Sequence, residues 1–306
     1  MEVTTAMIKE LREKTGAGIL DCKSALAECQ GDSAEAEKLL RKKGLAAAAK
    51  KAGRAASEGL IGYEVTAERA ALVELNSETD FVAKLEDFGK ARAELAKIVY
   101  GADALGNTEN GDVEKLKTMS APASLPGSTG GTIAEWLTAF TAKTGENTQL
   151  RRFARLVAAP GNVLTLYAHP GDKTVVVIET KGADQALGRD LAMHVAALSP
   201  QFANRESVSA KALEDEKEIA RAKAVAAGKP AGVVEKMVEG MIGKWYGEVV
   251  LVDQPFAKDD TKKVSQVIAE RAGKDAGVVR FVRFKVGEGI EKEKGDYAAE
   301  VAALAK

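Results

Sequence analysis

The stretch ELNSETDFVAK, residues 74–84, joins a predicted strand to a predicted helix in the first third of the chain. Before it, alternate apolar residues from Ala71 to Leu75 have the period of two that is typical of a strand. After it, apolar residues recur at helical spacing from Phe81 to Val99, which predicts a helix with one mostly apolar stripe. Residues 76–80 therefore form a strand-to-helix turn whose polar side chains can cap the helix.

Two interpretations of this turn are open. In the first, Asp80 caps the helix and Phe81 is its first core residue, which is a common arrangement. In the second, the turn presents the Asp80 carboxylate and the Phe81 ring side by side at a tip, where a partner can contact them. Spacing alone favours the first interpretation.

The same stretch resembles the central signature of bacterial-type elongation factor Ts, the nucleotide exchange factor of the translational GTPase elongation factor Tu. Further segments are similar to this family in the same order along the chain: LREKTGAGILDCKSALAE, DLAMHVAALSP, KMVEGMIGKWYGEV, QPF and VGEGIEKEKGDYAAEVA. The resemblance spans about Met1 to Lys306 and is interrupted mainly near residues 101–131. It implies that the chain binds elongation factor Tu, promotes release of GDP by disturbing the Mg²⁺ and phosphate site, and regenerates the GTP form.

The resemblance also implies which residues meet the GTPase. The counterpart of Phe81 inserts between helices of the GTPase domain, and the counterpart of Asp80 disturbs the magnesium side of the nucleotide site. The partner-binding residues expected from the family are Thr79, Asp80, Phe81, Val82, His169, Ile19 and Leu20. Ser77 stands where many members have Cys, and Glu78 where some have Gln, but neither change removes the Asp-Phe pair.

The chain lacks the sequence patterns of a nucleotide-binding or metal-dependent enzyme. No GxxxxGK[ST] loop occurs, and the pairs Gly16/Gly18 and Gly287/Gly289 lack the third glycine of GxGxxG. The two histidines, His169 and His194, have no Cys or Glu at metal-ligand spacing. We therefore expect an exchange factor without a catalytic site or cofactor of its own, while GDP, GTP and Mg²⁺ belong to the partner GTPase. His194 lies near the apolar stripe of its helix, which favours a core role.

Composition narrows the class of protein further. The chain has 306 residues, 45% of them hydrophobic and 29% charged, with a net charge of −1, which is typical of a soluble globular protein rather than a bulk nucleic-acid binder. Cys22 and Cys29 lie two helical turns apart, too far for a disulfide, which indicates free thiols in a reducing cytosol. Neither a signal peptide nor a membrane span is expected. The cytoplasm is the expected location, and a processed organellar form stays an open alternative.

The predicted fold class is α+β. It comprises a ubiquitin-associated-like three-helix module, two related strand-strand-helix subdomains, a protruding helical hairpin (coiled coil) and a C-terminal helix. The expected boundaries are 1–54 for the first module and its linker, 55–159 for the first subdomain with an irregular, mobile insertion at 101–131, 160–202 and 248–287 for the second subdomain, 203–247 for the hairpin, and 288–306 for the C-terminal module.

The hydrophobic pattern predicts most of the individual elements. The expected helices cover residues 5–14, 19–28, 32–44, 81–100, 133–144, 184–198, 209–227, 233–245 and 296–304, and the expected strands cover 60–65, 70–75, 163–168, 174–180, 248–252 and 278–286. The helix at 233–245 has a broad apolar face. In the family the hairpin is implicated in dimer contacts, which implies a homodimer or a two-plus-two complex with the GTPase. Burial of the apolar face by its own hairpin mate is the alternative.

Two other functions are alternatives to nucleotide exchange. The stretch from Arg41 to Arg54 is basic, with no acidic residue between Glu37 and Glu58, which fits either a solvated helical linker or a contact with RNA or ribosomes. A hydrolase using Asp80 or Glu78 with His169 has no recognisable arrangement. Exchange requires neither direct nucleic-acid binding nor a membrane.

Overall fold

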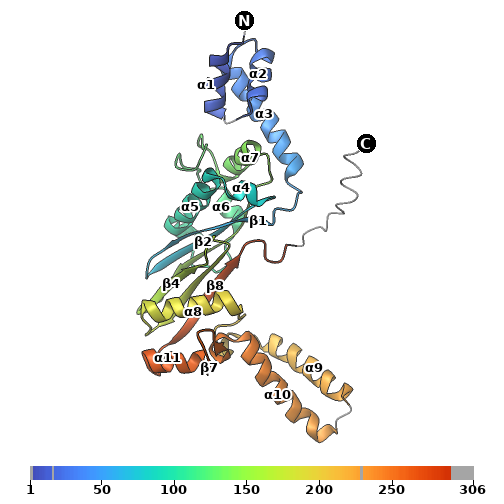
Figure 1. Cartoon of the computed structure of the whole chain (residues 1–306), viewed down its shortest axis with the longest axis vertical. Coiled ribbons are helices and arrows are strands. Elements are labelled where there is room, and N and C mark those ends of the chain that lie inside the picture. Colours follow the sequence, from blue (N-terminus) through green and yellow to red (C-terminus); the bar gives the residue numbers. More distant parts are fainter. Residues whose placement is uncertain (1–2, 16, 228–229, 291–306) are drawn as a thin grey trace. The chain divides into compact units, whose positions relative to one another are not determined.

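The computed structural model describes residues 3–15, 17–227 and 230–290 (Figure 1). The chain divides into two units. The first contains residues 1–63, 72–153 and 285–306, and the second contains residues 64–71 and 154–284. Residues 64–71 and 154–159, which the prediction places in the first subdomain, therefore group with the second unit. Mixed helices and sheets confirm the α+β class.

Three helices begin the first unit: α1 (Thr5–Thr15), α2 (Ile19–Glu28) and α3 (Ser33–Lys51). They bury Leu11, Cys22 and Leu26 in a small core of their own. The Asp32 side chain accepts hydrogen bonds from the N–H groups of Ala34 and Glu35, which confirms the predicted start of α3. Both cysteines are free thiols, as predicted.

The predicted end of α3 at Gly44 is wrong, because the helix continues to Lys51. Alanine, the best helix former, fills residues 46–49 and offsets the cost of one internal glycine. The glycine has a packing reason instead. A Cβ at Gly44 would lie 3.0 Å from the Cβ of Ala142 in α7 (Ile133–Thr144), so a larger residue would push the two helices apart.

The first sheet has the strand order β1-β2-β3, formed by β1 (Glu58–Val65), β2 (Arg69–Ser77) and β3 (Gln149–Val157). The central strand β2 is buried at every residue from Ala70 to Ser77, whereas the alternating pattern predicted a single buried face. A strand with neighbours on both edges and cover on both faces loses the alternation. The sequence marks out a segment at 149–158 without assigning it as a strand, and the structure shows that it forms the edge strand β3.

The predicted helix at 81–100 is two helices, α4 (Asp80–Ala83) and α5 (Glu86–Gly101). Leu85 between them has extended backbone angles, φ −64° and ψ 140°, which stops the first helix. The apolar stripe of α5 is buried at Phe88, Leu95 and Val99. Phe81 precedes the break and does not share that stripe.

The segment 102–131 is irregular, as predicted, but several of its residues are buried within the first unit. It contains a 3₁₀ turn, η1 (Asp103–Leu105), and a short helix, α6 (Val113–Lys117), capped by Asp112. Leu116 and Leu125 are fully buried, and the indole N–H of Trp136 donates to the carbonyl of Pro126 at 3.0 Å. These contacts argue against the expected mobility.

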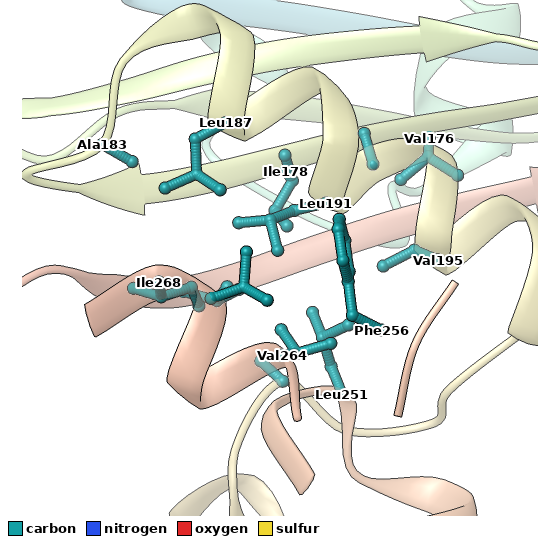
Figure 2. Close-up of a cluster of buried hydrophobic side chains, with 14 residues drawn as sticks. Val176, Ile178, Ala183, Leu187, Leu191, Val195, Leu251, Phe256, Val264 and Ile268 are labelled. Atoms are coloured by element: carbon teal, nitrogen blue, oxygen red, sulfur yellow. The ribbon is translucent and has the colours of Figure 1, made fainter. Parts of the chain in front are cut away.

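The second unit contains a sheet in the order β4-β5-β8, formed by β4 (Asn162–Ala168), β5 (Thr174–Lys181) and β8 (Gly277–Lys285). The strands β4 and β5 form the predicted antiparallel hairpin, with Val163 opposite Thr180. Asp184 accepts a hydrogen bond from the Leu187 N–H at 2.7 Å and caps α8 (Gln185–Leu198). Figure 2 shows the apolar core in which Ile178 of β5, Leu191 of α8 and Ile268 of α11 (Val264–Ala272) gather.

The predicted strand at 248–252 is wrong. The helix α10 (Ala231–Val249) runs into this segment and is followed by a 3₁₀ turn, η3 (Leu251–Asp253). Val249, Val250 and Leu251 are buried, and such a short apolar run does not distinguish a strand from a buried helix end. Two short strands, β6 (Pro255–Phe256) and β7 (Asp259–Lys263), and the helix α11 are not among the predicted elements.

The predicted helical hairpin is formed by α9 (Ala210–Ala226) and α10, and the Ser209 side chain caps α9. The two helices bury Ala220, Ala224, Val234, Val238 and Ile242 between them, so the hairpin mate covers part of the broad apolar face. The predicted helix at 296–304 lies outside the described residues. No helix among those described is long and apolar enough to cross a membrane.

Each of the two three-stranded sheets contains a buried carboxylate on its central strand. Glu74 of β2 is fully buried and lies 3.0 Å from the Arg151 guanidinium and 2.5 Å from that of Arg152. It also accepts a hydrogen bond from the Gly287 N–H at 2.9 Å. Glu179 of β5 is 1% exposed and accepts hydrogen bonds from the Ala159 N–H, the Asn162 amide and the Arg280 guanidinium.

We expect Glu74→Ala to lower the free energy of unfolding of the first unit by roughly 3–5 kcal/mol, because it leaves two arginines without their shared partner. Urea unfolding monitored by Trp136 fluorescence measures this, since Trp136 is buried in the same unit. The matched control is Glu86→Ala, which removes an exposed carboxylate paired with Lys90 and should leave stability almost unchanged. Equal effects of the two substitutions would contradict the role of Glu74.

A second expectation concerns pH. Burial tends to raise the pKa of Glu179, but the hydrogen bonds from Asn162, Ala159 and Arg280 outweigh it and hold that pKa below its ordinary value of 4.5. A carboxyl group whose pKa is lower in the folded state than in the unfolded state stabilises the fold at any pH above its unfolded-state pKa. This stabilisation is lost as the pH falls through its folded-state pKa. The free energy of unfolding of the second unit should therefore fall below about pH 4.5, and it should fall less steeply in Glu179→Gln. Parallel curves for the two proteins would count against this assignment.

Candidate interaction site

The short helix α4 presents one exposed aromatic ring. The side chain of Phe81 is 76% exposed, whereas those of its neighbours Val82 and Ala83 are only 7% and 3% exposed. The interpretation of Phe81 as the first core residue is therefore wrong. Val82 and Ala83 point into the first unit and fix the side of α4 from which Phe81 projects. Val82 is among the residues expected to contact the partner, and in the free chain its buried side chain anchors α4.

The Asp80 carboxylate lies next to the ring and is paired with Lys84. The Lys84 ammonium lies 2.6 Å from the carboxylate and 5.8 Å from the centroid of the Phe81 ring. Asp80 is not the N-cap residue of α4. That residue is Thr79, and its side chain makes no capping hydrogen bond. The tip thus presents a carboxylate, an ammonium and an aromatic face together, mostly in water.

The turn before α4 is held by residues that follow α7. The Thr79 N–H donates to Oε2 of Glu146 at 2.9 Å, and the Thr79 hydroxyl donates to Oε1 at 2.5 Å. One residue earlier, Oε1 of Glu78 accepts a hydrogen bond from the Asn147 N–H at 2.7 Å. Glu146 and Asn147 are not among the residues expected from the sequence, because no local pattern connects them with residues 78–79.

A separate apolar surface lies at the start of α2. Ile19 and Leu20 are 56% and 81% exposed, which is unusual for two adjacent large apolar side chains. The three-helix core buries Cys22, Ala25 and Leu26 later in the same helix, whereas Ile19 and Leu20 in its first turn stay exposed. The bundle therefore leaves this pair of side chains available to a partner.

The two histidines lie in different environments. His169 is exposed at the turn between β4 and β5, where the Tyr167 hydroxyl lies 3.1 Å from its Nδ1. His194 is fully buried, as predicted: Nδ1 accepts a hydrogen bond from the Ala257 N–H, so the proton is on Nε2, which donates to the Gln254 side chain. Burial lowers the pKa of His194, with an opposing effect of the Gln254 hydrogen bond. Its role is structural.

Among the residues that the structure describes, no group of three or more His, Cys, Asp or Glu side chains has the geometry of a metal site. The exposed groups at the tip belong to one carboxylate, one ammonium and one phenyl ring. This arrangement suits binding to another macromolecule, where an exposed aromatic residue can fill a partner's pocket.

Comparison with known proteins identifies a family. The family model described as "Elongation factor TS" matches residues 78–288. Elongation factor Ts of Syntrophotalea carbinolica is 46% identical over 315 residues and is covered completely, as is this chain. Elongation factor Ts of Methylococcus capsulatus is 46% identical, covering 99% of this chain and 98% of the relative. That of Rhodospirillum rubrum is 47% identical, covering 100% and 99%.

The geometry of α4 makes a direct prediction about stability. We expect Phe81→Ala to change the free energy of unfolding by no more than about 0.5 kcal/mol, as at an ordinary surface site. Val82→Ala, the adjacent control, should cost roughly 1–3 kcal/mol because it opens a cavity in a packed region. Thermal and urea unfolding of both variants test this. If Phe81→Ala is destabilised as much as Val82→Ala, the ring is part of the core in solution.

Proposed function

The chain belongs to the elongation factor Ts family, the guanine nucleotide exchange factors of elongation factor Tu, and we propose that it exerts this function through the tip formed by Asp80 and Phe81. The observation that supports the tip is the exposure of a large aromatic ring on a helix whose neighbouring residues are buried. Membership places the protein in translation elongation, where the exchange factor returns the GTPase to its GTP form.

An exchange factor acts by binding energy rather than by catalytic groups. It binds the nucleotide-free GTPase more tightly than the loaded one, and linkage requires it to weaken nucleotide binding by the same factor. The phosphates are held by backbone N–H groups, a lysine and Mg²⁺, so the factor must disturb these contacts. We propose no catalytic residue and no cofactor for this chain; GDP, GTP and Mg²⁺ are ligands of the partner.

The Phe81 ring suits the role of a wedge. Aromatic side chains in fully desolvated pockets are frequent hot spots of protein interfaces. The buried residues beside Phe81 hold its backbone in place before the partner arrives, which lowers the conformational entropy lost on binding. An exposed ring on an anchored backbone therefore provides affinity that a mobile loop would lack.

Asp80 supplies the negative charge of the proposed site. We propose that its carboxylate acts on the magnesium side of the nucleotide site, where a negative charge disfavours the phosphates. In the free protein the Lys84 ammonium neutralises part of that charge. Thr79 contributes by holding the turn, and Val82 by anchoring α4.

Two further surfaces complete the proposal. Ile19 and Leu20 form a second contact on the ubiquitin-associated-like bundle, and His169 forms a third at the β4–β5 turn. The hairpin of α9 and α10 is proposed to be the family's coiled coil. A homodimer or a two-plus-two complex with the GTPase stays a prediction, as does the cytoplasmic location.

The alternative of an RNA-binding linker is less well supported. Two of the cations in the basic stretch make internal contacts: the Lys51 ammonium donates to the Gly145 carbonyl at 2.6 Å, and the Arg54 guanidinium lies 3.4 Å from the Glu78 carboxylate. Charges that hold the linker on its own unit are less available for phosphates.

Stopped-flow release of labelled GDP from elongation factor Tu tests the proposal. Phe81→Ala should weaken binding to the nucleotide-free GTPase by roughly 2 kcal/mol or more, about thirtyfold, with a comparable fall in exchange efficiency. Val225→Ala is the control, because Val225 is an exposed apolar residue (61%) on the hairpin rather than at the tip. A folded Phe81→Ala variant that exchanges GDP normally would refute the proposed site.

A further inference from the structure

The helix α4 is too short to hold its own conformation. It contains four residues, whereas isolated helices in water need about 12–15 residues to be even marginally stable. Its N-cap residue, Thr79, makes no side-chain hydrogen bond to the first turn, although threonine commonly caps helices in this way. The direction of Phe81 must therefore be set by contacts from outside the helix.

Glu146 provides the contact at the N-terminal end of α4. Its two carboxylate oxygens accept the N–H and the hydroxyl of Thr79, at 2.9 and 2.5 Å. Because the hydroxyl donates outward to Glu146, it does not cap the helix. Hydrogen bonds to an ionised acceptor are about twice as strong as those between neutral groups. The bidentate carboxylate thus fixes the N-cap residue itself, which lies two positions before Phe81.

The loop that contains Glu146 is itself held on its other side. It follows Gly145, which ends α7 in the left-handed region at φ +77°. The Lys51 ammonium donates to the Gly145 carbonyl. The Asn147 side chain, 4% exposed as a residue, donates to the carbonyls of Ala52 and Arg54 at 3.3 and 2.7 Å. The carboxylate is therefore presented to Thr79 from an anchored loop.

We propose that Glu146 is a positioning residue for nucleotide exchange: it acts through Thr79 to fix the direction in which α4 presents Phe81. This inference rests on the proposed function of Phe81. Without Glu146, Thr79 loses the hydrogen bonds of its N–H and of its hydroxyl and keeps the contact of its carbonyl with the Ser77 hydroxyl. The ring then samples orientations that the partner must restrict. The exchange reaction bears that entropy cost.

A double-mutant cycle separates positioning from a general structural role. Four proteins are compared for GDP release from elongation factor Tu: the wild type, Glu146→Ala, Phe81→Ala and the double variant. Glu146→Ala should lower exchange efficiency about tenfold when Phe81 is present, the equivalent of 1.4 kcal/mol. In the Phe81→Ala background it should lower efficiency by no more than about twofold, because the group that it orients is absent.

Conservative variants sharpen the comparison. Glu146→Gln keeps one acceptor for the Thr79 N–H and can donate its amide to the hydroxyl, so it should retain most of the activity. Thr79→Val removes only the hydroxyl contact and serves if Glu146→Ala fails to fold. Glu135→Ala is the matched control. This substitution breaks the capping box of α7, but the Glu135 side chain does not contact Thr79, so exchange efficiency should be unchanged.

Amide hydrogen exchange gives a readout that is independent of the partner. In Glu146→Ala, protection should fall at residues 79–83 and stay unchanged in β2 and α5. Two results would overturn the role of Glu146 and leave the proposed function of Phe81 intact. The first is that Glu146→Ala lowers exchange efficiency equally with and without Phe81. The second is that Glu146→Ala exchanges GDP normally while Phe81→Ala is impaired. If Phe81→Ala itself exchanges normally, the proposed function of the tip fails, and the hydrogen-exchange result still decides whether Glu146 holds α4.

Discussion

The Glu74 carboxylate is completely buried in the first unit, and its position determines how the sheet and the tip are held together. An unpaired carboxylate in such a place would cost several kcal/mol, so its partners must stay in place. Those partners come from distant parts of the chain: Arg151 and Arg152 lie on β3, and the Gly287 N–H follows β8. Glu74 also lies on the strand that leads directly into the turn before α4. The base of the tip is therefore fixed by charge pairing, and the ring at its end does not need to contribute to the core.

The second unit also has a buried, arginine-paired carboxylate on its central strand, but the helix that follows this strand is capped differently. Glu179 is buried on the central strand β5 and is paired with Arg280 of β8, and a turn and a helix follow. There, Asp184 caps α8 directly by accepting from the Leu187 N–H. In the first unit the corresponding turn has no cap of its own, and Glu146 holds it from outside. At the uncapped turn, Asp80 and Phe81 are exposed to water. Both units therefore contain a strand, a turn and a helix in succession, but the two turns differ in the side chains that they expose.

Nucleotide exchange in this family requires binding energy and no reacting group. Exposed apolar side chains can supply such binding energy, and this chain has several. Large exposed apolar side chains include Phe81 on α4 and Ile19 and Leu20 on α2. Phe81 precedes the buried Val82, and Ile19 and Leu20 lie on a helix that is anchored in the bundle core by Cys22 and Leu26, so a small core holds the backbone that presents each of them. Burying these side chains would add stability, and leaving them in water is the kind of cost that proteins bear at functional sites.

Local sequence determined much of the fold, whereas tertiary contacts decided the geometry of the tip. Helical spacing and caps were sufficient for α2, α7 and α8, and the alternating pattern was sufficient for the hairpin of β4 and β5, because these signals lie within a few residues of one another. The family was likewise readable from motifs in order along the chain. The same helical spacing misplaced Phe81 in the stripe of Phe88, since it does not register the break at Leu85. Residues 248–272 were assigned poorly, because short apolar segments fit strands and helix ends equally well. The contact between Thr79 and Glu146 joins residues 67 positions apart, so only the folded chain brings the carboxylate to the turn and sets the direction of the ring.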